Sequence, residues 1–288
     1  MKIIKRCLFI ILIGILVLVL SVTGLYFYNE YINGRVVLTS YDYYNSEIPK
    51  SFDGYKIFMV SDLHNAPFSD DIIGLAEKTD PDIIVFCGDM VQLPDDDLTE
   101  TFNIIKKFKD DIPIYAVSGN HEMQNKSYWD INEKLWDEGA VLLEDDSVAI
   151  ERGEDSFLLL GVADPEADTL EEKHYDKLRE EINEEFPDGP CFSVLLSHRA
   201  DVYPEIKNTR ADLILSGHLH GGVVRLPFVG GVFGRTRKVE FPQYDYGFFD
   251  DPDSADMIVS GGCDKNPKKK RVFNPPEVVL ITLNCKEK

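Results

Sequence analysis

Five of the six histidines in this chain lie within short motifs made of residue types that commonly bind metal ions. Imidazole nitrogens and carboxylate oxygens are frequent ligands of divalent transition metals. The motifs, in chain order, are Asp62-Leu63-His64, Gly88-Asp89, Gly119-Asn120-His121-Glu122, Ser197-His198 and Gly217-His218-Leu219-His220-Gly221-Gly222. A single histidine in such a setting is more often a structural side chain. Five motifs in one chain instead predict a site that holds two metal ions.

The two residue types suit a pair of divalent cations. Two such cations a few ångströms apart can hold a phosphate group and activate water for in-line attack. The pair needs a bridging ligand, and a carboxylate can bridge because it has two oxygens. Neutral imidazoles keep the charge of the ligand set low, so that the cations remain Lewis-acidic. The i, i+2 spacing of His218 and His220 offers one imidazole to each cation. The pattern therefore predicts hydrolysis of a phosphate ester.

The motifs follow apolar runs that are typical of buried strands. These runs cover residues 55–60, 82–87, 112–117, 192–196 and 213–215. Helical patterns separate the first runs, beginning at Ser69 and covering residues 96–109 and 129–138. Strand exits that meet at one end of a sheet place loop residues on a rigid base. The alternation therefore predicts one α/β domain with the ligands gathered at one end of its sheet.

The remaining segments predict elements around this core. Residues 141–144, 148–152 and 157–162 are typical of consecutive short strands, which would form a meander beside the parallel strands. A charged helix is expected over about residues 170–186, with His174 exposed to solvent. Residues 35–44 predict an edge strand or a membrane-proximal arm. Residues 257–260 and 278–283 complete the predicted strands.

The N-terminal segment predicts a membrane anchor. No charged residue lies between Arg6 and Glu30, and such a stretch can cross a hydrocarbon core of roughly 30 Å at about 1.5 Å per residue. The basic residues before it favour a cytoplasmic N-terminus and an extracytoplasmic remainder. A cleaved signal peptide is the alternative, but Ser21-Val22-Thr23 matches a cleavage site poorly. We therefore expect residues 1–30 to form a single-pass anchor in the cell membrane and residues 31–288 one domain.

Charge and cysteine content exclude two classes of protein. The net charge is −21, and such a surface repels the phosphate backbone of nucleic acids, so no nucleic-acid partner is expected. An anionic substrate would need local positive charge, which metal ions would supply. The five cysteines form no CxxC pair and lie mostly in apolar runs, so no disulfide framework is predicted.

The five motifs together resemble the calcineurin-like metallophosphoesterase superfamily, whose signature is D-x-H, G-D, G-N-H-[DE], a later His, and G-H-x-H. Further segments resemble its membrane-anchored bacterial branch: Leu195-Leu196-Ser197-His198-Arg199, Arg225-Leu226-Pro227-Phe228, and Arg271 with Phe273-Asn274-Pro275-Pro276-Glu277. The resemblance implies a β-sandwich flanked by helices in α-β-β-α layers, preceded by one transmembrane helix. It also implies hydrolysis of a phosphodiester or pyrophosphate bond by a metal-bound hydroxide.

The resemblance also implies a role for each motif residue. Asp62, His64 and His220 would hold one divalent cation, while Asn120, His198 and His218 would hold the other, with Asp89 bridging them. His121 would bind no metal and would act as a catalytic group close to the leaving-group oxygen, either protonating it or stabilising phosphoryl charge. Mn²⁺, Fe, Zn²⁺ and Co²⁺ all suit this ligand set, and Mn²⁺ is our preferred assay metal.

Several alternatives remain open from the sequence. A non-catalytic metal-binding scaffold would have the same fold, and a lipid-linked pyrophosphate hydrolase would have the same site. The substrate is expected to be a phosphorylated small molecule or lipid. Val223 stands where relatives often carry Gln, and the basic run Lys268-Lys269-Lys270-Arg271 forms either a solvated loop or an anion-collecting rim. The apolar residues between Leu226 and Phe233 predict either core packing or a wall of the substrate site. Ser61 and Asn65 are expected to form local turns, and Glu122 either orients His121 or favours the start of a helix.

Overall fold

Two stacked β-sheets form the centre of the protein. The computed structural model describes residues 2–164, 180, 182–184, 191–234, 238–265 and 270–286. Each main sheet has six strands, in the orders β1-β14-β2-β3-β4-β5 and β12-β13-β9-β8-β7-β6. The first sheet contains β1 (Val37–Asn45), β14 (Glu277–Cys285), β2 (Tyr55–Val60), β3 (Ile83–Cys87), β4 (Ile114–Val117) and β5 (Val141–Leu142). The second contains β12 (Gly247–Phe249), β13 (Asp256–Val259), β9 (Leu213–Gly217), β8 (Ser193–Arg199), β7 (Asp155–Gly161) and β6 (Asp146–Arg152).

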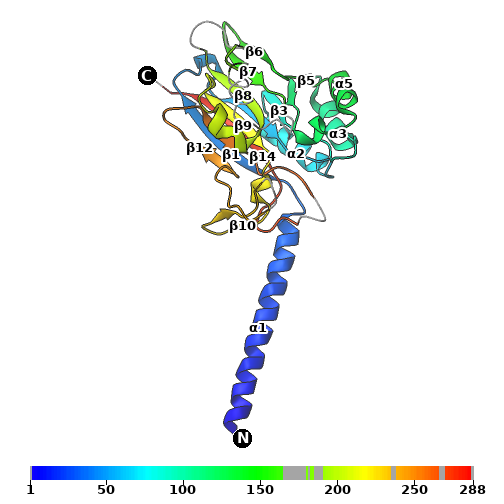
Figure 1. Cartoon of the computed structure of the whole chain (residues 1–288), viewed down its shortest axis with the longest axis vertical. Helices are drawn as coiled ribbons and strands as arrows, with labels where there is room; N and C mark the ends of the chain where they lie inside the picture. Colours follow the sequence, from blue (N-terminus) through cyan, green and yellow to red (C-terminus); the bar gives the residue numbers. More distant parts are fainter. Residues whose placement is uncertain are drawn as a thin grey trace.

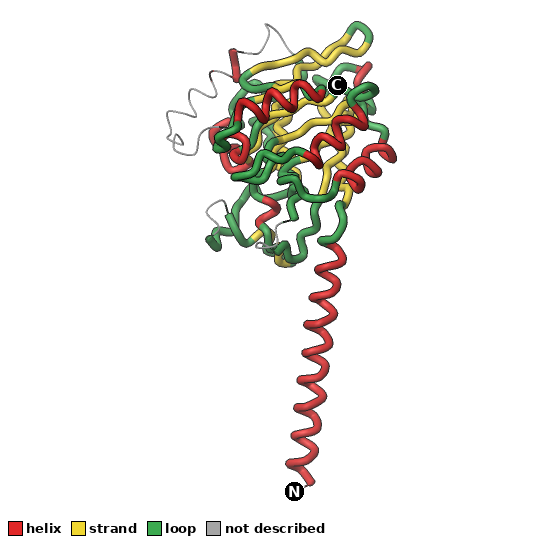
Figure 2. The backbone as a smooth tube through the Cα atoms, turned by 90° about the vertical axis from the view of Figure 1, so that its right-hand side faces the viewer, coloured by secondary structure: helices red, strands yellow, loops and turns green. Residues whose placement is uncertain are grey.

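Helices cover the outer faces of this sandwich. Among the described residues, the helices on the outer face of the first sheet are α2 (Ser69–Thr79), α3 (Thr99–Phe108), the short α4 (Asn120–Met123) and α5 (Tyr128–Glu138). On the second sheet lie η3 (Ala200–Val202) and α7 (Tyr203–Ile206). Short elements elsewhere are η1 (Lys50–Phe52), η4 (His220–Gly222), β10 (Arg225–Leu226) and β11 (Gly230–Gly231). Figure 2 shows the strands in the middle of the domain and the helices outside them. The predicted sandwich with helix layers is confirmed.

The central strands β2, β3, β8 and β9 are buried on both faces, which explains their nearly continuous apolar runs. Along β2, Ile57 and Met59 pack between the two sheets, while Phe58 and Val60 pack beneath α2, α3 and α5. This alternation follows from the two-residue period of a strand. An aromatic cluster joins the sheets: the ring of Phe157 on β7 lies 5.0 Å from that of Phe52. The site at the end of the strands therefore rests on a tightly packed base.

The first helix, α1 (Lys2–Ile32), projects away from the domain as a single rod (Figures 1 and 2). The most apolar 18-residue stretch within Ile3–Ile32 has a mean hydropathy of 3.0, and none of that stretch is buried in the protein. The end of this helix contacts the domain. The side-chain amides of Asn29, in the last turns, and of Asn33, just after the helix, donate to the backbone carbonyl of Arg271 at 2.9 and 2.7 Å. By length and composition this helix could cross a membrane or serve as a signal sequence.

Three sequence predictions differ from the structure. The predicted meander of three consecutive strands is wrong for its first strand, because β5 pairs with β4 in the first sheet. The other two strands, β6 and β7, form an antiparallel hairpin. The helix expected from residue 96 begins at Thr99, because the Asp97 carboxylate accepts a bond from the Thr99 amide and holds a turn there. The strand expected over residues 192–196 continues to Arg199, so His198 lies within it.

Other predicted elements are present. The edge strand expected near residues 35–44 is β1, which pairs in parallel with β14 at the edge of the first sheet. The charged helix expected over about residues 170–186 lies largely outside the described residues, and His174 lies wholly outside them. Lys268 and Lys269 of the basic run also lie outside them.

Removing the Phe157 ring tests the packing between the sheets. Phe157 is fully buried, so Phe157→Ala should lower the free energy of unfolding by about 3–5 kcal/mol through lost burial and a cavity. Trp136→Ala is the matched control, because that ring is 60% exposed and its loss should change stability by no more than about 0.5 kcal/mol. Denaturant unfolding followed by near-UV circular dichroism measures both. Equal effects of the two substitutions would contradict the packing described.

Candidate metal centre

The predicted ligands lie together where strands of both sheets end. Asp62 follows β2, Asp89 follows β3, and Asn120 begins α4 shortly after β4. From the second sheet, His198 lies near the end of β8 and His218 follows β9. Parallel pairing of β2, β3 and β4, and of β8 and β9, brings these ends to one side of each sheet. The two layers therefore face one site with ligands from both.

The backbone of this site is strained in a way that aims the side chains. Five of the seven predicted ligands have φ angles between 48° and 75°; they are Asp62, His64, Asp89, His218 and His220. Residues other than glycine adopt this left-handed region at a cost of about 1 kcal/mol or more. The surrounding hydrogen bonds maintain it: the amides of Asp62 and His64 donate to the carbonyls of Gly88 and Asp89, each at 3.0 Å. Such strain is concentrated at functional sites.

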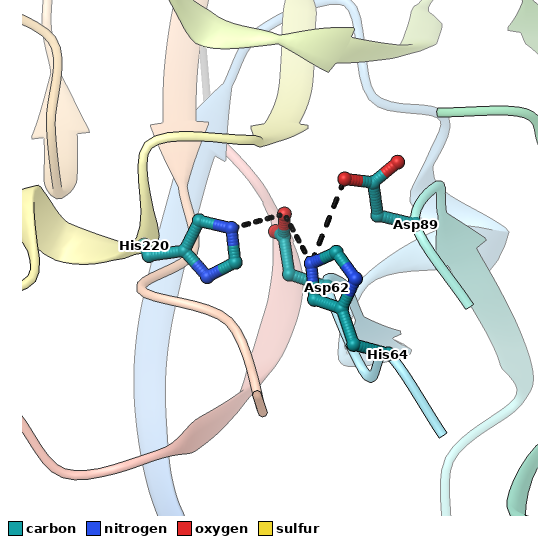
Figure 3. A group of neighbouring side chains, drawn as sticks. All are labelled: Asp62, His64, Asp89 and His220. Atoms are coloured by element: carbon teal, nitrogen blue, oxygen red, sulfur yellow. Dashed lines mark ion pairs between the residues drawn. The ribbon is translucent and has the colours of Figure 1, made fainter. Parts of the chain in front are cut away.

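Asp62, His64, Asp89 and His220 form the first group of converging donor atoms. Figure 3 shows their side chains pointing toward one another. The Nε2 atom of His220 lies 3.5 Å from Oδ1 of Asp62, and Nε2 of His64 lies 3.6 Å from Oδ2 of Asp89. All four donor atoms fall within 4.8 Å of one another. The spacing fits one cation between them.

Asp89, His198 and His218 form the second group. Nε2 of His198 lies 3.4 Å from Oδ2 of Asp89 and 3.3 Å from Nδ1 of His218. Burial raises the pKa of Asp89, but the neighbouring imidazoles lower it more, so that it lies well below its usual range. Asp89 belongs to both groups, so that a single carboxylate reaches both positions.

Hydrogen bonds select which nitrogen of each histidine faces the site. The Nδ1 atom of His198 lies 2.7 Å from the Cys87 carbonyl, and Nδ1 of His64 lies 3.1 Å from the Val91 carbonyl. A carbonyl can only accept, so both rings carry a proton on Nδ1 and turn the Nε2 lone pair toward the carboxylates. Histidine ligands of metal ions are commonly oriented in this way.

The donor set fits divalent cations. The Nε2 atom of His64 and the Oδ1 atom of Asn120 are both buried and have no hydrogen-bond partner among the residues that the structure describes. Asp62 and Asp89 are almost fully buried, and buried carboxylates require cationic partners or strong hydrogen bonds. A cluster of aspartate and histidine atoms in this fold suggests a dinuclear site for divalent metals. The role of each ligand and the identity of the metal stay predictions.

Glycines and Glu122 fix the loops of the site. A Cβ atom at Gly119 would overlap the Asp89 carboxylate, and one at Gly217 would overlap Ser61 and Asp62. The Glu122 carboxylate accepts hydrogen bonds from the amides of Asp89, Val91 and Gly119 at 2.8, 2.9 and 2.8 Å. Glu122 thus holds the loop of Asp89. The bond from the Gly119 amide caps the start of α4, so the expected role at a helix start is confirmed. The sequence did not predict the two bonds from the Asp89 and Val91 amides.

Asn65 lies in a local turn, as predicted, which the Ala66 amide closes on the Leu63 carbonyl. The turn expected at Ser61 is wrong, because its side chain instead connects the Asp62 carboxylate with the end of β3. The Ser61 hydroxyl is a hydrogen-bond donor with two acceptors in reach: Oδ2 of Asp62 at 2.6 Å and the Cys87 carbonyl at 3.1 Å. Oδ1 of Asn65 accepts a bond from the Glu100 amide at 3.0 Å and thereby supports the start of α3.

Asp264 orients the His220 ring by contacting its Nδ1 side, while the Nε2 side faces Asp62. An oxygen of this buried carboxylate lies 2.9 Å from Nδ1 of His220. The Arg271 guanidinium binds the same carboxylate through Nε at 2.8 Å and through Nη2. Burial raises the pKa of Asp264, but the charges of Arg271 and His220 lower it by more, so that this pKa lies well below its usual range. The motifs gave no signal for Asp264, because its position depends on a loop far away in the sequence.

A cavity of about 490 Å³ opens over the two groups. Its lining includes Asp89, Asn120, His121, His218 and His220, together with two basic side chains, Arg199 and Lys270. The buried Arg199 binds Asp164, and its Nη1 lies 3.4 Å from Nε2 of His218. The sequence pointed to Arg199 only as the neighbour of His198. Each basic side chain also pairs with a carboxylate, Arg199 with Asp164 and Lys270 with Glu30, and both are within the lining that a phosphate-sized anion would contact.

The apolar loop after the last motif lies partly on the cavity and partly on the surface. Val223, Val224 and Phe233 line the cavity. Leu226, Phe228 and Val229 are exposed, so core packing is wrong for these three residues. Val223 holds the turn after η4 with a φ of 60°, and the Asn274 amide donates to the His220 and Val223 carbonyls.

Comparison with known proteins gives a consistent picture. A family model described as calcineurin-like phosphoesterase matches residues 55–222. The uncharacterized metallophosphoesterase YkuE of Bacillus subtilis is 25% identical, over 92% of this chain and 91% of its own length. Phosphodiesterase YaeI of Escherichia coli is 27% identical, over 62% and 65%. The UDP-2,3-diacylglucosamine pyrophosphatase LpxG of Chlamydia muridarum is 28% identical over 31% of this chain and 28% of its own.

Neutralising Asp264 tests how His220 is held. Asp264→Asn removes the charge beside Nδ1 of His220, and substitutions behind a ligating histidine typically lower metal affinity about 10–100-fold. Asp212→Asn is the matched control, since the Asp212 carboxylate accepts bonds from Ser193 at the start of β8, away from both groups of donor atoms. Competition with a fluorescent chelator measures the Mn²⁺ affinity of both. Unchanged affinity in Asp264→Asn would contradict the orienting role.

Proposed function

Because this chain belongs to the calcineurin-like phosphoesterase family, we propose that it is a membrane-anchored hydrolase that uses two metal ions to cleave a phosphodiester or pyrophosphate bond outside the cytoplasm. The single observation that carries this proposal is the sharing of Asp89 between two groups of converging donor atoms. Relatives named as a phosphodiesterase and as a pyrophosphatase support both bond types.

We assign one cation to Asp62, His64 and His220 and the other to Asn120, His198 and His218, with Asp89 bridging. The convergence of four donors in the first group and three in the second supports this division. The unpartnered Oδ1 atom of Asn120, which lines the cavity with His218, supports its place in the second group. When bound, the two cations would supply Lewis acidity and positive charge for the phosphoryl oxygens.

His121 has a role distinct from the ligands. The Leu93 amide donates to Nδ1 of His121 at 3.0 Å, so the neutral ring carries its proton on Nε2. Burial lowers the pKa of His121 to about 4, which favours this neutral form. The Nε2–H group can therefore donate a hydrogen bond to a substrate oxygen in the cavity. This arrangement supports stabilisation of phosphoryl charge over proton transfer from a charged imidazolium.

The remaining residues of the cavity bind and orient the anion in this proposal. Arg199 is fixed by Asp164, and a guanidinium of fixed orientation suits phosphate oxygens. Lys270 contributes a second positive charge at the rim. These groups oppose the acidic net charge of −21 where the substrate enters. They bind the substrate but do not identify it, so the lipid-linked pyrophosphate hydrolase stays within this proposal.

We place the domain outside the cytoplasm and the anchor in the cell membrane. Lys2, Lys5 and Arg6 precede the apolar run of α1, and basic flanks remain on the cytoplasmic side. The anchor of residues 1–30 and the domain of residues 31–288 follow from the same pattern. Because Asn29 bonds to the domain, assays should use the full chain in detergent micelles.

Metal removal tests the central chemistry. The full chain should hydrolyse bis(p-nitrophenyl) phosphate with Mn²⁺, lose this activity on chelation and regain it when Mn²⁺ is restored. Asp89→Asn should lower both bound metal and turnover, the latter by about a hundredfold or more, because both groups lose their shared ligand. Turnover that survives both chelation and the substitution would refute the proposal. Metal content below one ion per chain would instead favour the non-catalytic scaffold.

Removing the His121 ring separates catalysis from metal binding. His121→Ala should lower kcat by about 10²–10³-fold, as loss of one charge-stabilising donor does elsewhere, with KM and metal content little changed. His174→Ala is the matched control, because this sixth histidine belongs to none of the five motifs. Steady-state kinetics and metal analysis on the same preparations provide the measurement. A large loss of metal in His121→Ala would assign it as a ligand and contradict its proposed role.

A further inference from the structure

An exposed apolar turn joins β10 to β11. The Val229 amide donates to the Leu226 carbonyl at 3.1 Å, which closes the turn. Phe228 at its tip has a relative exposure of 108%, and Leu226 and Val229 are also exposed. An exposed cluster of large apolar residues commonly marks a surface that contacts a protein or a membrane.

Phe228 is an unexpected residue at this position. Its φ of 66° lies in the left-handed region, where glycine or asparagine is favoured after a proline in such a turn. An aromatic residue here is both strained and exposed to water. Its recorded surroundings within the domain provide no compensating burial. The choice of Phe228 is therefore better explained by a contact outside the domain.

The turn lies beside the end of α1. At the base of the hairpin, the Arg225 amide donates to the Val272 carbonyl at 2.9 Å. The residues on both sides of Val272 bind α1, because Asn29 bonds to the Arg271 carbonyl and to the Phe273 amide. Figure 1 shows β10 at the edge of the domain from which α1 projects. The hydrogen bonds and the arrangement of the elements thus place the turn on the side of the domain from which α1 projects.

The exposed surface of α1 identifies the partner. Its side chains are almost entirely apolar and unburied over a length that suits a bilayer. Lys270, at the rim of the cavity, forms an ion pair of 3.0 Å with Glu30 near the end of α1. A bilayer that surrounds α1 would therefore have its headgroup layer next to the turn and the rim.

We propose that the β10–β11 turn inserts Phe228 and Val229 into the surface of the same bilayer that α1 spans. This inference rests on the membrane anchor in the proposed function. The turn and α1 would then fix the domain at two points, which sets its tilt. Val223, Val224 and Phe233, from the same segment as the turn, line the cavity, so this attachment would hold the cavity close to the lipid headgroups.

A single tryptophan introduced at the tip tests the insertion. Phe228→Trp is made in full-length protein that carries Trp129→Phe and Trp136→Phe, and the protein is reconstituted into phosphatidylcholine vesicles with or without brominated acyl chains. We expect a blue-shifted emission and a severalfold loss of intensity with brominated lipid. A variant that retains Trp136 alone is the matched control and should not be quenched, because that exposed side chain belongs to α5, away from α1 (Figure 1).

Leu16→Trp in the same background separates failure of the anchor from failure of the turn. Quenching at position 16 without quenching at position 228 would overturn the insertion and leave the anchor standing. No quenching at either position would refute the anchor itself. A blue shift at position 228 without quenching by brominated lipid would show that the tip contacts protein instead, and it would also overturn the proposal.

Phe228→Gly provides a second readout that a merely structural role would not give. Glycine relieves the left-handed conformation and removes no buried surface, so the melting temperature should be unchanged or higher. The rate on soluble bis(p-nitrophenyl) phosphate should also be unchanged, because Phe228 is absent from the described lining of the cavity. A clear fall in melting temperature would mean that Phe228 stabilises the domain, which would contradict a role at the membrane.

Discussion

The structure depends on the burial of two carboxylates, Asp62 and Asp89, where two stacked sheets end. Buried negative charge is costly unless positive partners and hydrogen-bond donors surround it. The protein provides imidazoles from both sheets, amide donors from the loops and glycines that allow the chains to approach. Left-handed backbone at five of the predicted ligands is part of the same arrangement. A pair of divalent cations, which this cluster suggests, would complete the charge balance.

Much of the site could be predicted from the sequence because its ligands lie in short motifs at strand ends. The apolar runs before Asp62 and Asp89 are buried on both faces, so strand and loop were easily distinguished. What the sequence did not reveal depends on contacts between distant segments. Asp264 approaches His220 only through folding of the last loop, and β5 joins the first sheet because of its pairing with β4. The start of α3 was misplaced because the Asp97 carboxylate accepts bonds from both the amide and the hydroxyl of Thr99, where the helix begins.

A series of direct contacts joins helix α1 to the metal centre. Asn29 bonds to the loop of Arg271, Arg271 binds Asp264, and Asp264 lies against His220. This series of contacts connects the end of α1 with a predicted metal ligand across the whole length of the sequence. The segment that holds the end of α1 therefore also supports the site.

The central claim is that two cations lie on either side of Asp89. Anomalous diffraction at the manganese edge, from crystals of the full chain grown with Mn²⁺, tests it most directly. The account predicts two peaks, one among Asp62, His64 and His220 and the other among Asn120, His198 and His218, with the Asp89 carboxylate between them. A single peak, or peaks away from Asp89, would contradict it.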